Sequence, residues 1–205
     1  MRVRAGRFLD PVVPGHSLDK PGYEEAIVSA LRNHVRQGDH VVVVGGGWGV
    51  SATVAAEQTG ASGNVHVYEG AQDGVEHVHE TAALNGCEDR ITVEHAIVGQ
   101  EVSLYSDSGD APVLPGSEIP ACDVLVLDCE GAELDILADL TIEPSTIIVE
   151  THGFLGAPVD DVRDRLIDLG YSVRKCTVAE SANADYCEEN GIYVLVATPT
   201  SATTD

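Results

Sequence analysis

The sequence is poor in aromatic residues and lacks long apolar runs. Aromatic residues make up 4% of the 205 residues and hydrophobic residues 43%, so we expect a core built mainly of Val, Ile, Leu and Ala. No apolar run is long enough to span a bilayer, and no apolar signal-peptide segment follows the basic start of the chain. These absences predict a cytoplasmic protein without a membrane partner.

Paired cysteine motifs are also missing. Five cysteines are present, and none of them belongs to a Cys-x-x-Cys pair. An odd number of cysteines without such pairs argues against a disulfide framework and against a zinc site. Cys122 and Cys129 lie in an apolar run, so we expect them to behave as small core residues.

Basic residues are few, and lysine is nearly absent. Only Lys20 and Lys175 are lysines among eleven basic residues, and the formal net charge is −23. A surface of this charge repels nucleic acid, which we therefore exclude as a partner. The composition resembles that of proteins from salt-loving microbes. At ~1 M salt the Debye length is only about 3 Å, so such charges are largely screened. We interpret the acidity as solvation of the surface.

The most informative segment is a run of valines at 41–44 followed by Gly45-Gly46-Gly47-Trp48-Gly49. The valines predict a strand buried on both faces, and the glycines allow a sharp turn close to a ligand. A helix over 50–58 would present its N-terminus, which favours an anion. Glu69 ends the next strand, where it could accept hydrogen bonds from two ribose hydroxyls. We therefore predict a nucleoside-binding unit that contains Gly45, Gly46, Gly47, Gly49 and Glu69.

Strands and helices alternate along the chain. We expect strands over 40–44, 64–69, 90–95, 122–127, 146–150, 171–176 and 192–197, a short extra strand over 102–105, and helices over 21–38, 50–59, 72–85, 131–140 and 158–169. This order predicts an α/β, Rossmann-like, seven-stranded, mostly parallel sheet with helices on both faces. Residues 177–190 offer no convincing crossover helix, so we expect the last strand to be antiparallel.

Two segments of the chain carry no such periodicity. Residues 1–20 predict an irregular N-terminal arm before a single domain over 21–205. Residues 106–121 form a long loop rich in Ser, Asp, Gly and Pro, and long loops inside a domain are often functional.

Acidic residues follow the strand over 122–127. Asp128, Glu130 and Glu133 lie close together, where they repel each other unless a cation or hydrogen bonds stabilise them. Ligands of open α/β sheets bind outside the carboxyl ends of the strands, which favours a ligand-binding role for Asp128 and Glu130. Capping of the following helix is the alternative, and for Glu133 we favour such a structural role.

Glu150 and His152 end the neighbouring strand. His152 titrates near neutrality when unperturbed, so it could accept a proton from a hydroxyl group. Asp128, Glu150 and His152 together would also suit Mg²⁺ or Mn²⁺. No recognised motif demands a metal, and we expect none.

In this order the motifs resemble those of class I S-adenosylmethionine-dependent methyltransferases, and more narrowly those of the FkbM-type methyltransferases. The resemblance runs from about Tyr23 to His152. Its most specific parts are Leu127-Asp128-Cys129-Glu130-Gly131-Ala132-Glu133 and Ile147-Ile148-Val149-Glu150-Thr151-His152.

The resemblance implies S-adenosylmethionine as cofactor and methylation of an oxygen on a small molecule or glycan. The glycine loop would contact the methionine end and Glu69 the ribose, while Ala96 and Ile97 would flank the adenine. Asp128 would orient the sulfonium, and Glu130 or His152 would remove the proton of the acceptor.

Two other functions remain open on the sequence. Gly47-Trp48-Gly49-Val50-Ser51-Ala52 also fits the dinucleotide pattern G-x-G-x-x-A, so the chain could be an NAD-dependent oxidoreductase. That alternative leaves the acidic cluster and the antiparallel end of the sheet unexplained. The chain could also be a non-catalytic nucleoside-binding protein.

Overall fold

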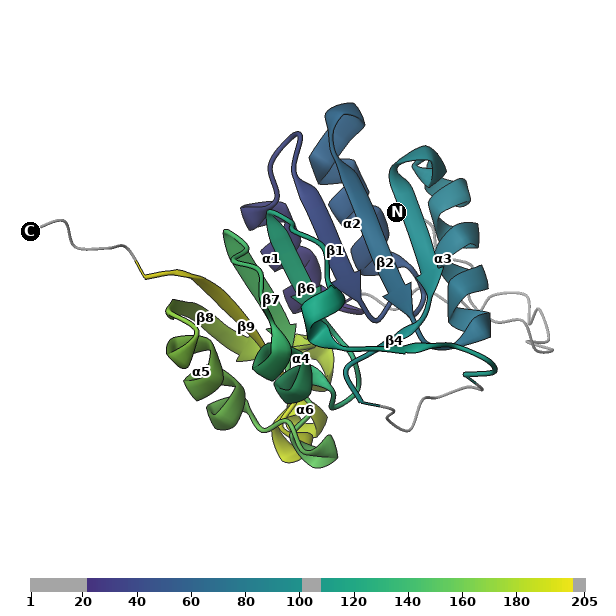
Figure 1. The fold of residues 1–205 in the computed structure, drawn as a ribbon. Helices are drawn as coiled ribbons and strands as arrows, with labels where there is room; N and C mark the ends of the chain where they lie inside the picture. Colours follow the sequence, from purple (N-terminus) through teal and green to yellow (C-terminus); the bar gives the residue numbers. More distant parts are fainter. Residues whose placement is uncertain (1–21, 101–107, 201–205) are drawn as a thin grey trace, which may run out of the picture.

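The computed structural model describes residues 22–100 and 108–200, which form a twisted sheet between layers of helices (Figure 1). Seven strands lie in the order β3-β2-β1-β6-β7-β9-β8. Strand β9 is antiparallel to β7 and β8, whereas the other neighbours in this sheet pair in parallel. The predicted mostly parallel sheet with an antiparallel last strand is confirmed. The strands are β1 (His40–Val44), β2 (Asn64–Glu69), β3 (Ile91–His95), β6 (Val124–Leu127), β7 (Thr146–Glu150), β8 (Tyr171–Val178) and β9 (Tyr193–Pro199).

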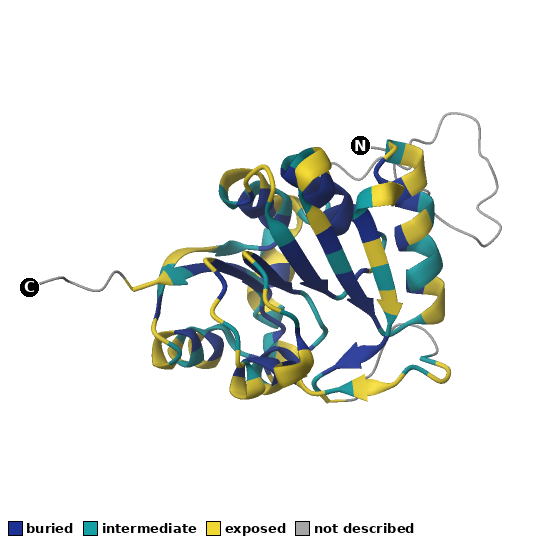
Figure 2. Cartoon of the chain, turned by 45° about the horizontal axis from the view of Figure 1, so that its top comes forward, coloured by how far each residue is buried: buried dark blue, intermediate teal, exposed yellow. Residues whose placement is uncertain are grey.

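Helices cover both faces of the sheet, and they bury nearly all side chains of the central strands β1, β6 and β7. Val41 and Val43 belong to the core on one face, whereas Val42 and Val44 belong to the core on the other. The first core includes residues of α1 (Glu25–His34), α2 (Val50–Thr59) and α3 (Gln72–Asn85). The second includes residues of α4 (Glu133–Asp139) and α5 (Val159–Asp168). Figure 2 shows these strands as buried along most of their length.

The predicted helices over 50–59 and 72–85 are confirmed as α2 and α3. The first helix is shorter than expected, because the chain after His34 turns extended at Val35, where the backbone N–H still bonds Leu31. The expected absence of a crossover helix over 177–190 is confirmed, although a short helix, α6 (Ala184–Asn190), lies between β8 and β9. This helix has seven residues and joins antiparallel strands, so it does not form a crossover.

A second small sheet, which the sequence did not indicate, lies beside the end of β3. Its strands β4 (Ile97–Val98) and β5 (Val113–Leu114) are parallel, so the predicted loop over 106–121 contributes a strand. The predicted arm over 1–20 and extra strand over 102–105 lie outside the described residues. Short 3-10 turns occupy 60–62, 88–90, 116–118, 153–155 and 181–183. Within the described ranges, each helix is too short or too polar to cross a lipid bilayer.

Candidate active site

Four strands end side by side at one edge of the sheet. Their register places Val44 of β1 opposite Tyr68 of β2 and Leu127 of β6, and Leu127 opposite Val149 of β7. The residues that follow directly are Gly45, Glu69, Asp128 and Glu150. The fold therefore brings residues from distant parts of the sequence to the edge where open α/β sheets bind ligands.

The loop after β1 passes very close to the end of β6. Gly45 has φ +94°, and a Cβ atom on it would lie 1.7 Å from the backbone oxygen of Asp128. The Gly45 N–H donates to Tyr68 O and the Asp128 N–H donates to Val44 O, so both neighbouring strands fix this approach. Only glycine fits at this position, because a side chain would displace the backbone that carries Asp128.

Glu69 holds the next part of the glycine loop. Its Oε2 accepts the backbone N–H groups of Gly46 at 2.7 Å and Gly47 at 2.8 Å, and its Oε1 accepts that of Ala71 at 2.7 Å. A carboxylate has about four acceptor positions, so roughly one remains for a ligand. The side chain thus shapes the loop in addition to bordering the cavity, and the two loop N–H groups are already engaged.

A cavity of about 400 Å³ lies between the strand ends and the loop. Its volume falls within the range of small-molecule sites, about 300–1,000 Å³. Of the predicted site residues, its lining includes Gly45, Gly46, Gly47, Glu69, Ala96, Ile97, Asp128 and Glu130. Eight of the predicted site residues therefore line the same cavity.

Two predicted residues do not line this cavity. Gly49 is the N-cap residue of α2 and has φ +75°, and a Cβ atom there would lie 2.9 Å from Cα of Val78 in α3. Close packing of two helices therefore explains this glycine. His152 lies behind Asp128, in the cluster described below.

The sequence did not indicate five further residues of the lining, which are Tyr23, Glu24, Trp48, Tyr68 and His77. The rings of Trp48 and His77 are stacked, with centroids 4.1 Å apart and planes 21° from parallel. The sequence could have indicated Trp48 as a lining residue, because an indole inside a glycine loop is unusual. It could not have indicated His77, because the position of His77 depends on how α3 packs against the loop.

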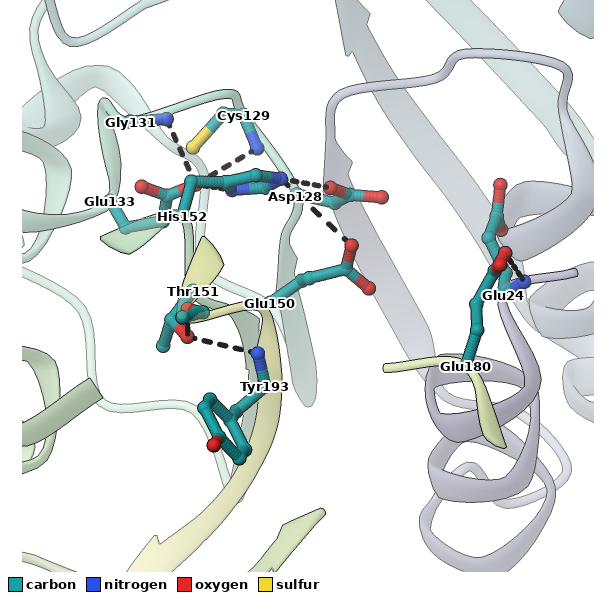
Figure 3. A network of polar contacts seen from close by, with 11 residues as sticks. Glu24, Asp128, Cys129, Gly131, Glu133, Glu150, Thr151, His152, Glu180 and Tyr193 are labelled. Carbon is teal, nitrogen blue, oxygen red and sulfur yellow. Dashed lines mark hydrogen bonds and ion pairs between the residues drawn. The ribbon is translucent and has the colours of Figure 1, made fainter. Parts of the chain in front are cut away.

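A second group of polar residues adjoins the cavity at Asp128 (Figure 3). Nδ1 of His152 lies 2.7 Å from Oε1 of Glu133. The same oxygen accepts the backbone N–H groups of Gly131 at 3.2 Å and Cys129 at 3.4 Å. The Glu133 side chain is 0% exposed and that of His152 5%. Glu133 thus has the structural role expected for it, and it also orients His152.

Burial and crowding change the pKa values of these groups. Burial raises the pKa of Glu130 to about 7, although His152 opposes this rise. Burial alone would lower the pKa of His152, but the hydrogen bond with Glu133 and the charge of Asp128 raise it to about 9. Burial also raises the pKa values of Asp128 and Glu150 above their usual range. At pH 7 His152 is therefore mostly protonated, whereas Glu130 is close to half ionised.

Two acids at the cavity have a strained backbone. Glu24 has φ +51° and Glu130 φ +55°, and they are the two non-glycine residues with positive φ in the described ranges. A non-glycine residue in this region costs roughly 1–2 kcal/mol, and such strain concentrates at functional sites. Both residues line the cavity, so the strain coincides with the predicted site.

Comparison with known proteins agrees with this geometry. Residues 110–173 match the family model of the methyltransferase FkbM domain. This segment contains β6, α4 and β7, so it includes Asp128, Glu133 and His152. No curated protein sequence matches the chain.

Solved structures share the fold over most of the chain. An S-adenosylmethionine-dependent O-methyltransferase from Thermotoga maritima aligns with a TM-score of 0.58 and 17% identity, over 93% of this chain and 69% of that chain. A methyltransferase from Geobacter sulfurreducens, in complex with S-adenosyl-L-homocysteine, aligns with a TM-score of 0.57 and 15% identity, over 88% of this chain and 92% of that chain. A ribosomal protein L11 methylase from Lactobacillus delbrueckii aligns with a TM-score of 0.57 and 16% identity, over 86% of this chain and 79% of that chain.

The names of the Thermotoga maritima and Lactobacillus delbrueckii proteins imply different methyl acceptors, so the shared fold does not specify an acceptor. The FkbM match covers the most specific motif of the predicted resemblance, and the structural neighbours carry the class I methyltransferase fold. The predicted resemblance is confirmed: residues 110–173 are similar to the methyltransferase FkbM domain, and the chain has the fold of class I S-adenosylmethionine-dependent methyltransferases.

Proposed function

We propose that this protein is an S-adenosylmethionine-dependent methyltransferase and that it transfers the methyl group to an oxygen atom of a small molecule or glycan. The observation that carries the proposal is the single cavity bordered by the glycine loop, Glu69 and the Asp128–Glu130 segment. When bound, S-adenosylmethionine supplies a methyl group activated by its positively charged sulfur.

The residues of the cavity suit the parts of this cofactor. Glu69 keeps roughly one acceptor position for a ribose hydroxyl, and Ala96 and Ile97 offer an apolar surface for the adenine. Because the carboxyl group of Asp128 borders the cavity, we assign the positive end of the cofactor to Asp128. Its carboxylate would attract the ammonium and sulfonium groups.

Glu130 is the better candidate for the base that accepts the proton of the acceptor. It lines the cavity and its backbone is held in a strained conformation, whereas His152 lies outside the lining. A group with a pKa near 7 is suited to proton transfer at neutral pH, and a mostly protonated His152 is not. Most of the rate enhancement would come from holding the acceptor oxygen in line with the methyl group.

The charge of the protein restricts the acceptor. With a formal net charge of −23, the surface disfavours polyanions such as RNA and DNA. A neutral or weakly charged hydroxyl compound is therefore the proposed acceptor class.

Isothermal titration calorimetry with S-adenosylmethionine and NAD⁺ tests the cofactor. We expect S-adenosylmethionine to bind and NAD⁺ to bind at least about tenfold more weakly. In Glu69→Gln an amide NH₂ or carbonyl replaces the charged acceptor of the loop, so we expect roughly 10–100-fold weaker binding, since each tenfold is about 1.4 kcal/mol. Glu88→Gln is the matched control, because Glu88 is exposed in the turn before β3. Tighter binding of NAD⁺ would reject the proposal.

Activity is tested by incubating the protein with S-adenosylmethionine that carries a labelled methyl group and a panel of hydroxylated small molecules and glycans. We expect labelled ether or ester products and release of S-adenosylhomocysteine. Glu130→Gln should lower kcat by about 10²-fold or more, in the range typical for loss of a general base, with little change in cofactor affinity. Transfer of the label to RNA in molar salt would contradict the proposed acceptor class.

A further inference from the structure

We propose that Asp128, Glu150 and His152 bind one divalent metal ion, of which Mn²⁺ is the best match, at the border of the methyl-transfer cavity. The sequence alone led us to expect no metal, and the geometry points to a different conclusion. The metal site itself is independent of the proposed function. Its role in holding the acceptor oxygen depends on that function.

The three side chains converge on one small volume. One ligand atom from each, a carboxylate oxygen of Asp128 and Glu150 and a ring nitrogen of His152, lies within 4.8 Å of the other two. Nε2 of His152 is 3.7 Å from Oδ1 of Asp128 and 3.9 Å from Oε1 of Glu150. Atoms at these separations can share a cation at roughly 2.0–2.5 Å, the usual length of metal–oxygen and metal–nitrogen bonds.

His152 provides further support, because its Nε2 atom faces this volume. Its side chain is 5% exposed, yet Nε2 is too far from both carboxylates for a hydrogen bond. Nε2 therefore has only long ion-pair contacts to two carboxylates, and an ion bound between the three groups could coordinate all of them. Figure 3 shows His152 directed between Asp128 and Glu150.

The other ring nitrogen is held as it is in known metal sites. Metal-binding histidines usually donate their second N–H to a carboxylate, which fixes the ring and its tautomer. Here Nδ1 lies 2.7 Å from the fully buried Glu133. Glu133 in turn accepts two backbone N–H groups at the start of α4, so it is itself fixed.

The kinds of ligand indicate which metal and which role. Two carboxylates favour Mg²⁺ or Mn²⁺, and the imidazole shifts the preference towards Mn²⁺. Three protein ligands leave coordination positions open for water or for a substrate oxygen. Because Asp128 also lines the cavity, an ion here could hold the hydroxyl of the acceptor and ease its deprotonation beside Glu130.

The test measures Mn²⁺ binding by electron paramagnetic resonance and calorimetry on chelator-treated full-length protein. About 1 M KCl would suppress weak binding to the acidic surface, because it shortens the Debye length to about 3 Å. We expect one Mn²⁺ per chain and weaker competition by Mg²⁺. Glu150→Gln removes a ligand outside the cavity lining and should weaken binding at least about tenfold. Glu133→Gln should weaken it roughly 10–100-fold through the orientation of His152.

Glu130→Gln is the matched control, because it removes the same charge beside Asp128 without removing a proposed ligand. It should retain Mn²⁺ affinity within about threefold, and circular dichroism checks that each variant folds. The absence of a stoichiometric site in the wild type, or equal weakening in Glu130→Gln and Glu150→Gln, would overturn the metal proposal. Binding of S-adenosylmethionine is measured in parallel. Cofactor binding without Mn²⁺ binding rejects the metal alone, whereas Mn²⁺ binding without cofactor binding rejects the proposed function alone.

Discussion

Oε1 of Glu133, at the start of α4, lies 2.7 Å from Nδ1 of His152, just beyond the end of β7. The two side chains are 0% and 5% exposed, so the contact is shielded from water. A hydrogen bond between charged groups is strong in such surroundings, and an unpaired buried charge is costly. This contact therefore fixes the imidazole ring that faces Asp128 and Glu150.

The first prediction concerns this contact. In Glu133→Gln the negative charge next to His152 is lost, so the pKa of His152 should fall from about 9 towards its usual range. The free energy of unfolding should decrease by roughly 1–3 kcal/mol, because the amide is a weaker acceptor for the imidazole and for the two backbone N–H groups. NMR titration of the imidazole and urea denaturation, both on chelator-treated protein, measure both effects. Glu57→Gln on the exposed side of α2 is the control, and an unchanged His152 pKa would refute the prediction.

The second prediction separates two neighbouring loop glycines. A Cβ atom on Gly46 would lie 2.7 Å from Cγ2 of Val78 and 2.9 Å from Cγ1 of Val67, whereas one on Gly47 would meet nothing within 4 Å. Gly47→Ala should therefore cost only the backbone strain of its φ of +49°, about 1 kcal/mol. Gly46→Ala should cost roughly 1–3 kcal/mol through overpacking and should also weaken cofactor binding.

Urea denaturation and calorimetry with S-adenosylmethionine compare these two variants. The cofactor affinity of Gly46→Ala should fall because Oε2 of Glu69, which holds the loop, would be 3.2 Å from the new Cβ atom. If both variants lost equal amounts of stability and of cofactor affinity, the loop would not have the shape described.

The order of strands and helices could be predicted because it depends on local patterns. The valine run at 41–44 and the helical spacing over 72–85 give nearly the observed bounds of β1 and α3. The small sheet of β4 and β5 could not be predicted, since two-residue strands carry no periodicity and pair residues sixteen positions apart. Helix α6 was missed for a related reason, because a seven-residue polar segment resembles a loop.

The site could be predicted only as a set of residues. The positions of Gly45, Glu69 and Asp128 follow from their place after parallel strands, whose carboxyl ends lie together. Their partners do not follow from the sequence, because hydrogen bonds such as that from the Gly46 N–H to the Glu69 carboxylate depend on side-chain conformation. The stacking of Trp48 on His77 likewise depends on the packing of α3 against the loop.

The third prediction uses Trp48, the only tryptophan of the chain, as a reporter. Its ring lines the cavity and is stacked on His77, so a ligand in the cavity should change its surroundings. Addition of S-adenosylmethionine should change the intensity or the wavelength of tryptophan emission, with the same midpoint as in calorimetry. In His77→Ala the emission of the free protein should differ, because the stacking partner is removed. A titration without any change in emission would contradict the position of Trp48 at the cofactor cavity.

The fourth prediction concerns pH. Burial and the nearby charge of Asp128 raise the pKa of Glu24 to about 8 from a usual value of 4.5. Its Oε2 is buried, and within the described residues no hydrogen-bond partner reaches it. Between these two pKa values the folded protein holds a proton that the unfolded chain releases. The stability linked to Glu24 is therefore fully present below about pH 4.5 and is lost as the pH rises through about 8.

The wild-type protein should accordingly be less stable at pH 9 than at pH 6, and His152 adds to this trend because its pKa is raised to about 9. One proton contributes on the order of 1 kcal/mol per pH unit. In Glu24→Gln the side chain is neutral at every pH. The decrease in the free energy of unfolding between pH 6 and 9 should therefore be smaller than in the wild type, by on the order of 1 kcal/mol per pH unit. Urea denaturation at constant high salt measures it, with Glu57→Gln as the control that retains the wild-type slope. If Glu24→Gln also retains this slope, Glu24 does not hold the extra proton, and the carboxyl group must be ionised in the folded protein.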